Sequence, residues 1–204
     1  MPTVRRSPGT ATRRPRHMHG IVHKTLETYV VDRTDEETWE RVVDRADLEP
    51  RLYLQVSHYD DREIDAVLET LTELAPQDRR TIERGFGRTL APELLSTFNA
   101  HIRTDRDVLE LLANLEQTVR EIDTATEKAS LPDISSRPDG NEVTVTYDTH
   151  RETTYCGLAH GVLEGLLTAF DADGTVTEQA CGREDEGEDD VDACRFLVTV
   201  EDEE

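Results

Sequence analysis

The chain has 204 residues, of which 45 are acidic and 23 basic, and its formal net charge is −22. This length favours one domain, or one domain with short tails. The charge excludes nucleic acid and anionic membranes as direct partners, because both would repel the chain. All basic residues except Lys24 and Lys128 are arginines. An acidic, lysine-poor composition resembles proteins of salt-loving archaea, in which salt screens the repulsion between carboxylates; an ordinary acidic protein is the alternative.

The two ends of the chain differ in composition from the rest. Residues 1–17 are rich in arginine and contain no acidic residue. We predict that they are a basic disordered tail or a mis-called start, with Met18 as the true start. Residues 202–204 are an acidic tail, so 18–201 is predicted to be a single domain. The three cysteines give no disulfide framework, so we expect a reducing, cytoplasmic setting. No apolar run approaches the ~18 residues of a membrane span, so we expect no membrane insertion.

Apolar residues recur at three- and four-residue steps in the first half of the chain, which predicts helices between residues 18 and 125. Two helices are predicted from Met18 to about Leu48, and a third over 60–76. Residues 77–99 are predicted to form shorter helices that break near Gly85, Gly87 and Pro92.

The clearest helical pattern covers about residues 105–124. Five apolar residues step by four, three, four and three positions: Val108, Leu112, Leu115, Val119 and Ile122. This spacing places them on one buried face of a single long helix.

The hydrophobic period changes from 3.6 towards 2 after a turn-rich linker over 130–142. The predicted elements are a strand over 142–149, a helix over 153–170 and two strands over 174–181 and 193–201, which the acidic loop 182–192 joins as a hairpin. The predicted fold class is therefore α+β, with a helical half (18–125) followed by a mixed strand-helix-strand-strand half (141–201).

The stretch "YDTHR" (147–151) is a candidate binding motif. Tyr147, Thr149 and Arg151 alternate, and residues two apart in a strand point to the same face. Arginine can hold a carboxylate through two parallel hydrogen bonds, and the hydroxyls can donate further ones. The row therefore suits a bound carboxylate; a surface strand with an ordinary salt bridge is the alternative.

The order of elements and two motifs resemble the heme nitric-oxide/oxygen-binding family, known as H-NOX or HNOB. The start "MHGIVHKTLETYVVDR" is similar to the Met-x-Gly opening that is frequent in this family, and "YDTHR" followed by "GLAHGVLEGLLTAF" is similar to its YxSxR strand and glycine-rich helix. The resemblance implies a cytosolic sensory domain that binds heme b between its two halves. It also implies that Tyr147, Thr149 and Arg151 hold the heme propionates.

The family's axial histidine has no counterpart in this sequence. Its expected position is occupied by Thr118 or Val119, in a stretch without His, Cys, Met or Tyr. The nearest histidine, His101, is ~27 Å away along a continuous helix, at ~1.5 Å per residue. This departure puts heme b in doubt, because five-coordinate heme needs a protein ligand.

Other clusters of possible ligands carry little information. The odd number of cysteines (Cys156, Cys181 and Cys194), without C-x-x-C spacing, predicts neither a disulfide framework nor a zinc site. Cys156 and His160 have metal-ligand spacing on one helix, but two residues do not make a site. His19 and His23 share this spacing and are predicted to lie on a polar helix face.

No catalytic motif is present, so we expect a protein that is not an enzyme. The first functional hypothesis is a heme-binding gas-sensing domain, whose partners would be a diatomic gas and a signalling protein such as a kinase, cyclase or chemotaxis receptor. The alternative is a degenerate, heme-free fold that serves as a protein-interaction module or binds another apolar anion, such as a fatty acid. A small metal-dependent enzyme that uses Cys156 and His160 is the third.

Overall fold

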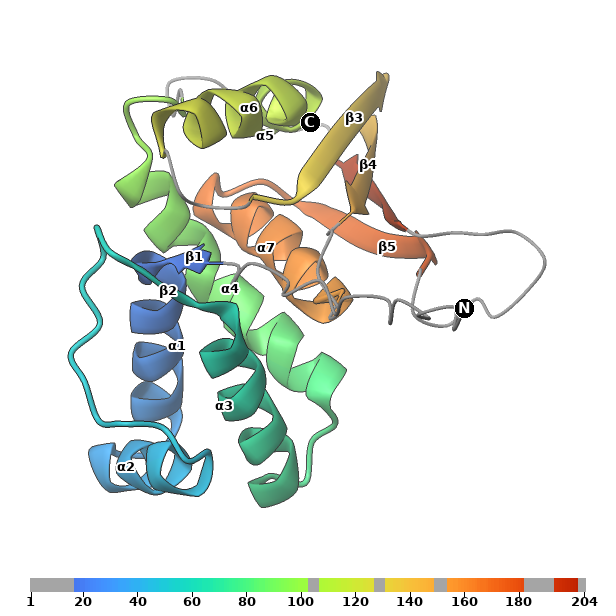
Figure 1. Cartoon of the computed structure of the whole chain (residues 1–204). Helices are drawn as coiled ribbons and strands as arrows, with labels where there is room; N and C mark the ends of the chain where they lie inside the picture. Colours follow the sequence, from blue (N-terminus) through green and yellow to red (C-terminus); the bar gives the residue numbers. More distant parts are fainter. Residues whose placement is uncertain (1–16, 103–106, 127–130, 149–153, 182–192, 202–204) are drawn as a thin grey trace, which may run out of the picture.

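The computed structural model describes residues 17–102, 107–126, 131–148, 154–181 and 193–201. A helical half is followed by a half that contains a four-stranded sheet and one long helix (Figure 1). The predicted α+β class, with helices first and the sheet last, is confirmed. Among the described residues, no helix combines the length and apolar composition that crossing a bilayer requires.

The helices of the first half begin at sites that the sequence marks clearly. They are α1 (Gly20–Arg33), α2 (Glu36–Arg45), α3 (Asp61–Leu74), α4 (Arg79–Thr97), α5 (Val108–Ala113) and α6 (Leu115–Ala125). An aspartate side chain accepts a backbone N–H at the start of α2, α3, α4 and α5: Asp35, Asp60, Asp78 and Asp107. Such caps stabilise a helix by satisfying an N–H that lacks an intrahelical partner. Two short strands, β1 (His17–His19) and β2 (His58–Asp60), pair antiparallel beside α1.

Two helix predictions are wrong. Residues 79–97 form the single helix α4, which continues through Gly85, Gly87 and Pro92. In contrast, the long helix predicted over 105–124 is divided into α5 and α6 at Asn114, whose side-chain amide donates to the carbonyl of Glu110 at 2.8 Å. That local hydrogen bond caps α5 and allows the chain to turn.

The sheet has one strand more than predicted. Its members are β3 (Asp133–Asp139), β4 (Glu142–Asp148), β5 (Gly174–Ala180) and β6 (Cys194–Val200), all antiparallel in the order β3-β4-β6-β5. The predicted linker over 130–142 contains β3, which turns into β4 at Gly140 (φ 62°). Pro138 is tolerated because β3 is an edge strand. The predicted pairing of β5 with β6 is confirmed, and the loop 182–192 lies outside the described residues.

Helices α4 and α7 (Cys156–Ala169) lie side by side at the centre of the molecule (Figure 1). Both contribute to the two clusters of buried apolar side chains, one around the sheet and one among α1–α4. Gly157, Gly161 and Gly165 recur every four residues on α7, so they share one face of that helix. This face lies against α4, because a Cβ at each of the three would come within 2.6 Å of an atom of α4.

Glu83 joins α4 to the start of α7. It is completely buried, accepts a hydrogen bond from Arg79 Nε at 2.8 Å and accepts the N–H of Gly157 at 3.2 Å. We expect Glu83→Ala to lower the free energy of unfolding by about 3 kcal/mol, because it removes one member of a buried ion pair and leaves a buried N–H without its acceptor. Denaturant unfolding in high salt would measure the loss.

Glu116→Ala is the matched control for this prediction. Glu116 forms an i,i+4 ion pair with Arg120 on the more exposed helix α6, where such pairs contribute only about 0.3–0.5 kcal/mol. Equal losses for the two variants would contradict the structural role of Glu83.

Candidate ligand-binding cavity

An apolar cavity of about 240 Å³ lies where the helical half meets the sheet. Helices α1, α4, α5, α6 and α7 and the strands β3, β4 and β6 all contribute to its wall. Most lining residues are aliphatic or phenylalanine, for example Ile21, Leu90, Val145, Val162 and Phe196. The cavity therefore suits a ligand with an apolar body.

One imidazole, that of His19, lines the cavity among the described residues. Its Nδ1 accepts the N–H of Ile21 at 3.4 Å and so caps α1. Its ring contacts the rings of His58 and Phe98 edge-on, each with 5.3 Å between centroids. Burial first, and then the neighbouring His58, lower the pKa of His19 below its usual value. The imidazole is therefore neutral at neutral pH.

Two tyrosines line the cavity. Tyr147 lies near the end of β4, opposite Ile134 of β3 and Cys194 of β6. Tyr155 precedes α7, is 1% exposed and adopts a left-handed conformation (φ 49°). The sequence pattern gives no sign that Tyr155 lines a cavity.

Helix α6 presents no metal ligand to the cavity. Its lining residues are Leu115, Thr118, Val119 and Ile122. The hydroxyl of Thr118 donates to the carbonyl of Asn114 at 3.1 Å, which is a bond within the helix. Leu115, Val119 and Ile122 belong to the apolar face that the sequence predicts, and the structure turns this face towards a cavity as well as a core.

Comparison with known proteins identifies the family to which the chain belongs. The model of the heme-NO-binding (HNOB) family matches residues 19–178. The chain belongs to this family. No curated protein matches it.

Several solved H-NOX structures share the fold. An H-NOX protein from Shewanella oneidensis, in its Fe(II) state and with three substitutions, is 20% identical with a TM-score of 0.80 over 92% of this chain and 98% of that one. A mutant H-NOX protein from K. algicida, in the unliganded Fe(II) state, is 18% identical with a TM-score of 0.74, over 91% and 97% of the two chains. The architecture described above is thus the H-NOX fold, recognisable although sequence identity is low.

The cavity fits heme in one respect and not in another. Its apolar wall suits a flat porphyrin ring. Groups that can ligate iron in proteins are His, Cys, Met and Tyr, and among the described lining residues they belong to Met18, His19, Tyr147 and Tyr155, none of which is on α6. Helix α6 of this H-NOX domain therefore offers no histidine that could bind iron in the cavity.

The structure tests only one residue of the predicted carboxylate row. Tyr147 reaches the cavity wall from β4. Thr149 and Arg151 lie outside the described residues, so their role stays a prediction.

The predictions for His19 and His23 and for the cysteines need correction. His23 is 1% exposed and packs against the rings of Tyr53 and Tyr59, so His19 and His23 do not form a polar helix face. The ring nitrogen Nε2 of His160 lies 3.2 Å from the carbonyl oxygen of Val176. This contact accounts for the position of His160 without a metal ion shared with Cys156.

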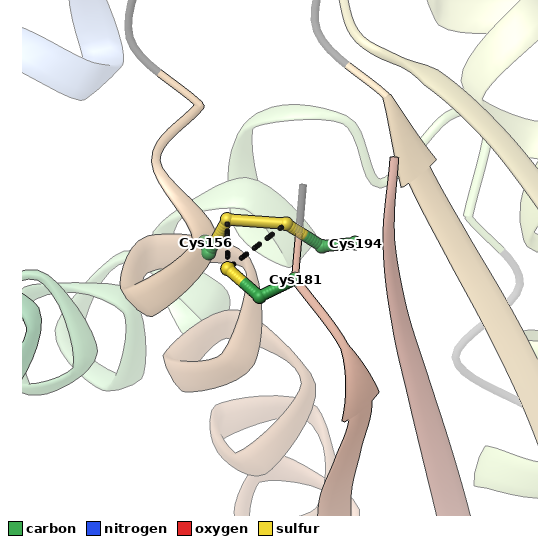
Figure 2. Close-up of side chains that lie close together, drawn as sticks. All are labelled: Cys156, Cys181 and Cys194. Atoms are coloured by element: carbon green, nitrogen blue, oxygen red, sulfur yellow. Dashed lines mark hydrogen bonds between the residues drawn. A yellow bond between two sulfur atoms is a disulfide. The ribbon is translucent and has the colours of Figure 1, made fainter. Parts of the chain in front are cut away.

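The absence of a disulfide is also contradicted. Cys156 and Cys194, 38 positions apart, are joined by a disulfide bond, and the Sγ of Cys181 lies 3.2 Å from that of Cys156 (Figure 2). An odd number of cysteines does not exclude a disulfide, because the fold decides which cysteines lie next to each other.

Proposed function

We propose that this H-NOX domain is a sensory domain, rather than an enzyme, that receives heme in the apolar cavity and holds its propionates through Tyr147, Thr149 and Arg151. The observation that carries the proposal is the position of Tyr147. It lies at the end of β4 and lines the cavity, so the carboxylate-binding row would begin where a ligand with an apolar body ends. A guanidinium further along the same row would meet the acidic end of that ligand.

We propose further that Thr118 or Val119 occupies the axial position. Heme would then be bound chiefly through its carboxylates and its apolar ring, and less tightly than with a histidine ligand. His19 is the imidazole available on the described cavity wall. It could bind iron through Nε2 only if its Nδ1 carried the proton and gave up the hydrogen bond from the N–H of Ile21.

A heme-free function is the second candidate, and the composition of α6 favours it. With Thr118 and Val119 on the cavity wall, the same space suits any amphipathic carboxylate, such as a fatty acid. A protein-interaction module without a ligand belongs to the same alternative. The two candidate functions differ in whether the cavity binds a ligand that contains iron.

The partners would follow from the family. A diatomic gas would bind the heme, and a signalling protein such as a kinase, cyclase or chemotaxis receptor would receive the signal, in the cytoplasm. We propose a salt-loving source from the charge of −22, and binding is therefore to be measured in molar salt.

Hemin titration of the full chain tests the proposal. We expect a stoichiometric, sharpened Soret band that shifts when nitric oxide is added to the reduced sample. Arg151→Ala should weaken hemin binding by at least about tenfold, since a hydrogen bond to a charged group contributes ~1.5–3 kcal/mol when it is lost.

Arg137→Ala is the matched control, because it removes the same charge from the exposed neighbouring strand β3. It should leave hemin affinity within about twofold of the unmodified protein, since surface charges contribute little. A broad free-hemin spectrum at all ratios would rule out the heme proposal. Displacement of a fluorescent fatty acid from the same sample would then support the heme-free candidate.

A further inference from the structure

A second pocket, lined mostly by polar side chains, lies beside the apolar cavity. Its volume is about 500 Å³. It is formed by the segment after α4 and by the helices α5 and α6, which lie together at the top of Figure 1. Leu111 and Thr118 line both this polar pocket and the apolar cavity. The pocket and the cavity are therefore neighbours that share part of their walls.

The lining of the polar pocket is rich in hydrogen-bond acceptors. Glu110 and Glu121 line it, and ionised carboxylates can only accept. The amide nitrogen of Asn114 donates to the carbonyl of Glu110 at 2.8 Å, and that of Gln117 donates to Oε1 of Glu121 at 2.9 Å. The hydroxyl of Thr118 donates to the carbonyl of Asn114 at 3.1 Å. These three side chains thus use their donors within the helices, and their oxygens remain as acceptors.

Such a pocket favours a positively charged ligand that donates hydrogen bonds. No lysine or arginine is present among its described lining residues. A metal ion is a poor occupant, because in the described part of the chain only the cysteines bring three or more ligand atoms within 4.8 Å of one another. An organic ammonium ion suits the pocket better, since –NH₃⁺ carries three N–H donors and its bonds to carboxylates are charge-assisted.

The neighbouring cavity indicates what the rest of the ligand is. Leu115 and Val119 of α6 line the apolar cavity, whereas Gln117 and Glu121 of the same helix line the polar pocket. Helix α6 therefore offers an apolar face to one space and an acidic, acceptor-rich face to the other. A molecule that occupies both spaces has an apolar chain and a cationic head.

We propose that the apolar cavity and the polar pocket are two parts of one binding site for an amphipathic ammonium ion. The chain of this ligand lies in the cavity and passes between Leu111 and Thr118, and its –NH₃⁺ head is held by the acceptors of the pocket. The site requires neither iron nor Arg151, so it goes beyond the function proposed above.

The test is a calorimetric titration of the full chain with primary alkylammonium ions from butyl to octyl. Molar salt screens the attraction that the net charge of −22 exerts on any cation. We expect affinity to rise about threefold to fourfold for each added methylene, as burial of a methylene in an apolar space predicts. Octylammonium should bind at least about fivefold more tightly than octanol, which has the same chain and no charge. An affinity that does not depend on chain length, or equal binding of octanol, would overturn the proposal.

A pair of double variants locates the cationic head. Replacing Glu110 and Glu121 by glutamine should weaken octylammonium binding at least about fivefold, because two partly exposed charge pairs are lost. The matched control is Glu116→Gln with Asp123→Asn, which removes two charges from α6 outside the pocket lining. The control should stay within about twofold of the unmodified protein. Equal losses in the two double variants would assign the binding to overall charge and refute the site.

A cavity-filling variant locates the chain. Val119→Trp adds a large side chain at a residue that lines the apolar cavity, so it should abolish the gain in affinity from butyl to octyl. The length series on the unmodified protein decides the matter even if this variant does not fold. Hemin titration separates this proposal from the heme proposal. A chain that binds octylammonium and no hemin contradicts the heme proposal alone, and a chain that binds hemin and no octylammonium contradicts the ammonium site alone.

Discussion

Gly161→Ala is expected to lower the free energy of unfolding by about 3 kcal/mol or more, since overpacking a rigid contact costs ~1–3 kcal/mol and occasionally more. A Cβ on Gly161 would lie 2.0 Å from the carbonyl oxygen of Arg84 and 2.9 Å from its Cα. Both are backbone atoms of α4, so no side chain can rotate out of the way. Alanine gains about 1 kcal/mol in helix propensity over glycine, which offsets only part of this cost.

The effect is large because the helices approach closely from both sides. On α4, a Cβ at Gly87 would lie 2.4 Å from the carbonyl oxygen of Leu158 and 2.7 Å from the N of Val162. Separating α4 from α7 by the width of a methyl group would loosen both apolar clusters, since the two helices contribute to each. Denaturant midpoints and thermal unfolding in high salt would measure the loss.

Gly140→Ala is the control for the same chemical change. Gly140 lies in the β3–β4 turn, where an added methyl group would have nothing within 4 Å, but its φ is 62°. The expected cost there is the ~1–2 kcal/mol of a left-handed alanine, without a steric component. If Gly161→Ala were no more destabilising than Gly140→Ala, the close packing of α7 against α4 would be refuted.

These glycines explain why the sequence predicts α7 correctly and α4 incorrectly. In α7 the apolar residues between the glycines keep a helical period, so the helix is recognisable. In α4, Gly85 and Gly87 stand two apart and Pro92 follows, which is a pattern typical of breaks. Tertiary packing decides otherwise, because a Cβ at Gly85 would meet the hydroxyl of Tyr29 at 2.6 Å. The glycines in α4 allow neighbouring atoms to approach the helix closely, and they do not end it.

The candidate sites also show that local sequence does not predict which distant residues meet in the fold. The alternation around Tyr147 predicts a strand with a binding face, and the structure places this residue on the cavity wall. The meeting of Cys156, Cys181 and Cys194 could not be predicted, because separations of 25 and 13 residues carry no local signal. β5, β6 and α7 must first be assembled. Strand β3 cannot be recognised from its own residues for a related reason. Pro138 and Gly140 are typical of a turn, and the segment becomes a strand only by pairing with β4.

A histidine placed on α6 is expected to convert the cavity into a strong heme site. Val119→His would present an imidazole from a residue that already lines the cavity, and neutral histidine is a frequent heme ligand. We expect hemin affinity to rise by at least about tenfold, which corresponds to ~1.4 kcal/mol, with a sharper Soret band and a five-coordinate ferrous spectrum. Hemin titration and ferrous spectra, with and without nitric oxide, would measure this.

Two further histidine variants decide whether position, rather than an added imidazole, produces the gain. Thr118→His tests the other residue proposed for the axial position, which also lines the cavity. Arg120→His places the same ring on the exposed side of α6 and should leave hemin binding unchanged. If neither Val119→His nor Thr118→His improved binding, the proposed axial position would be wrong. If Arg120→His improved it equally, the gain would come from non-specific imidazole binding, and the apolar cavity would have to be assigned to a ligand without iron.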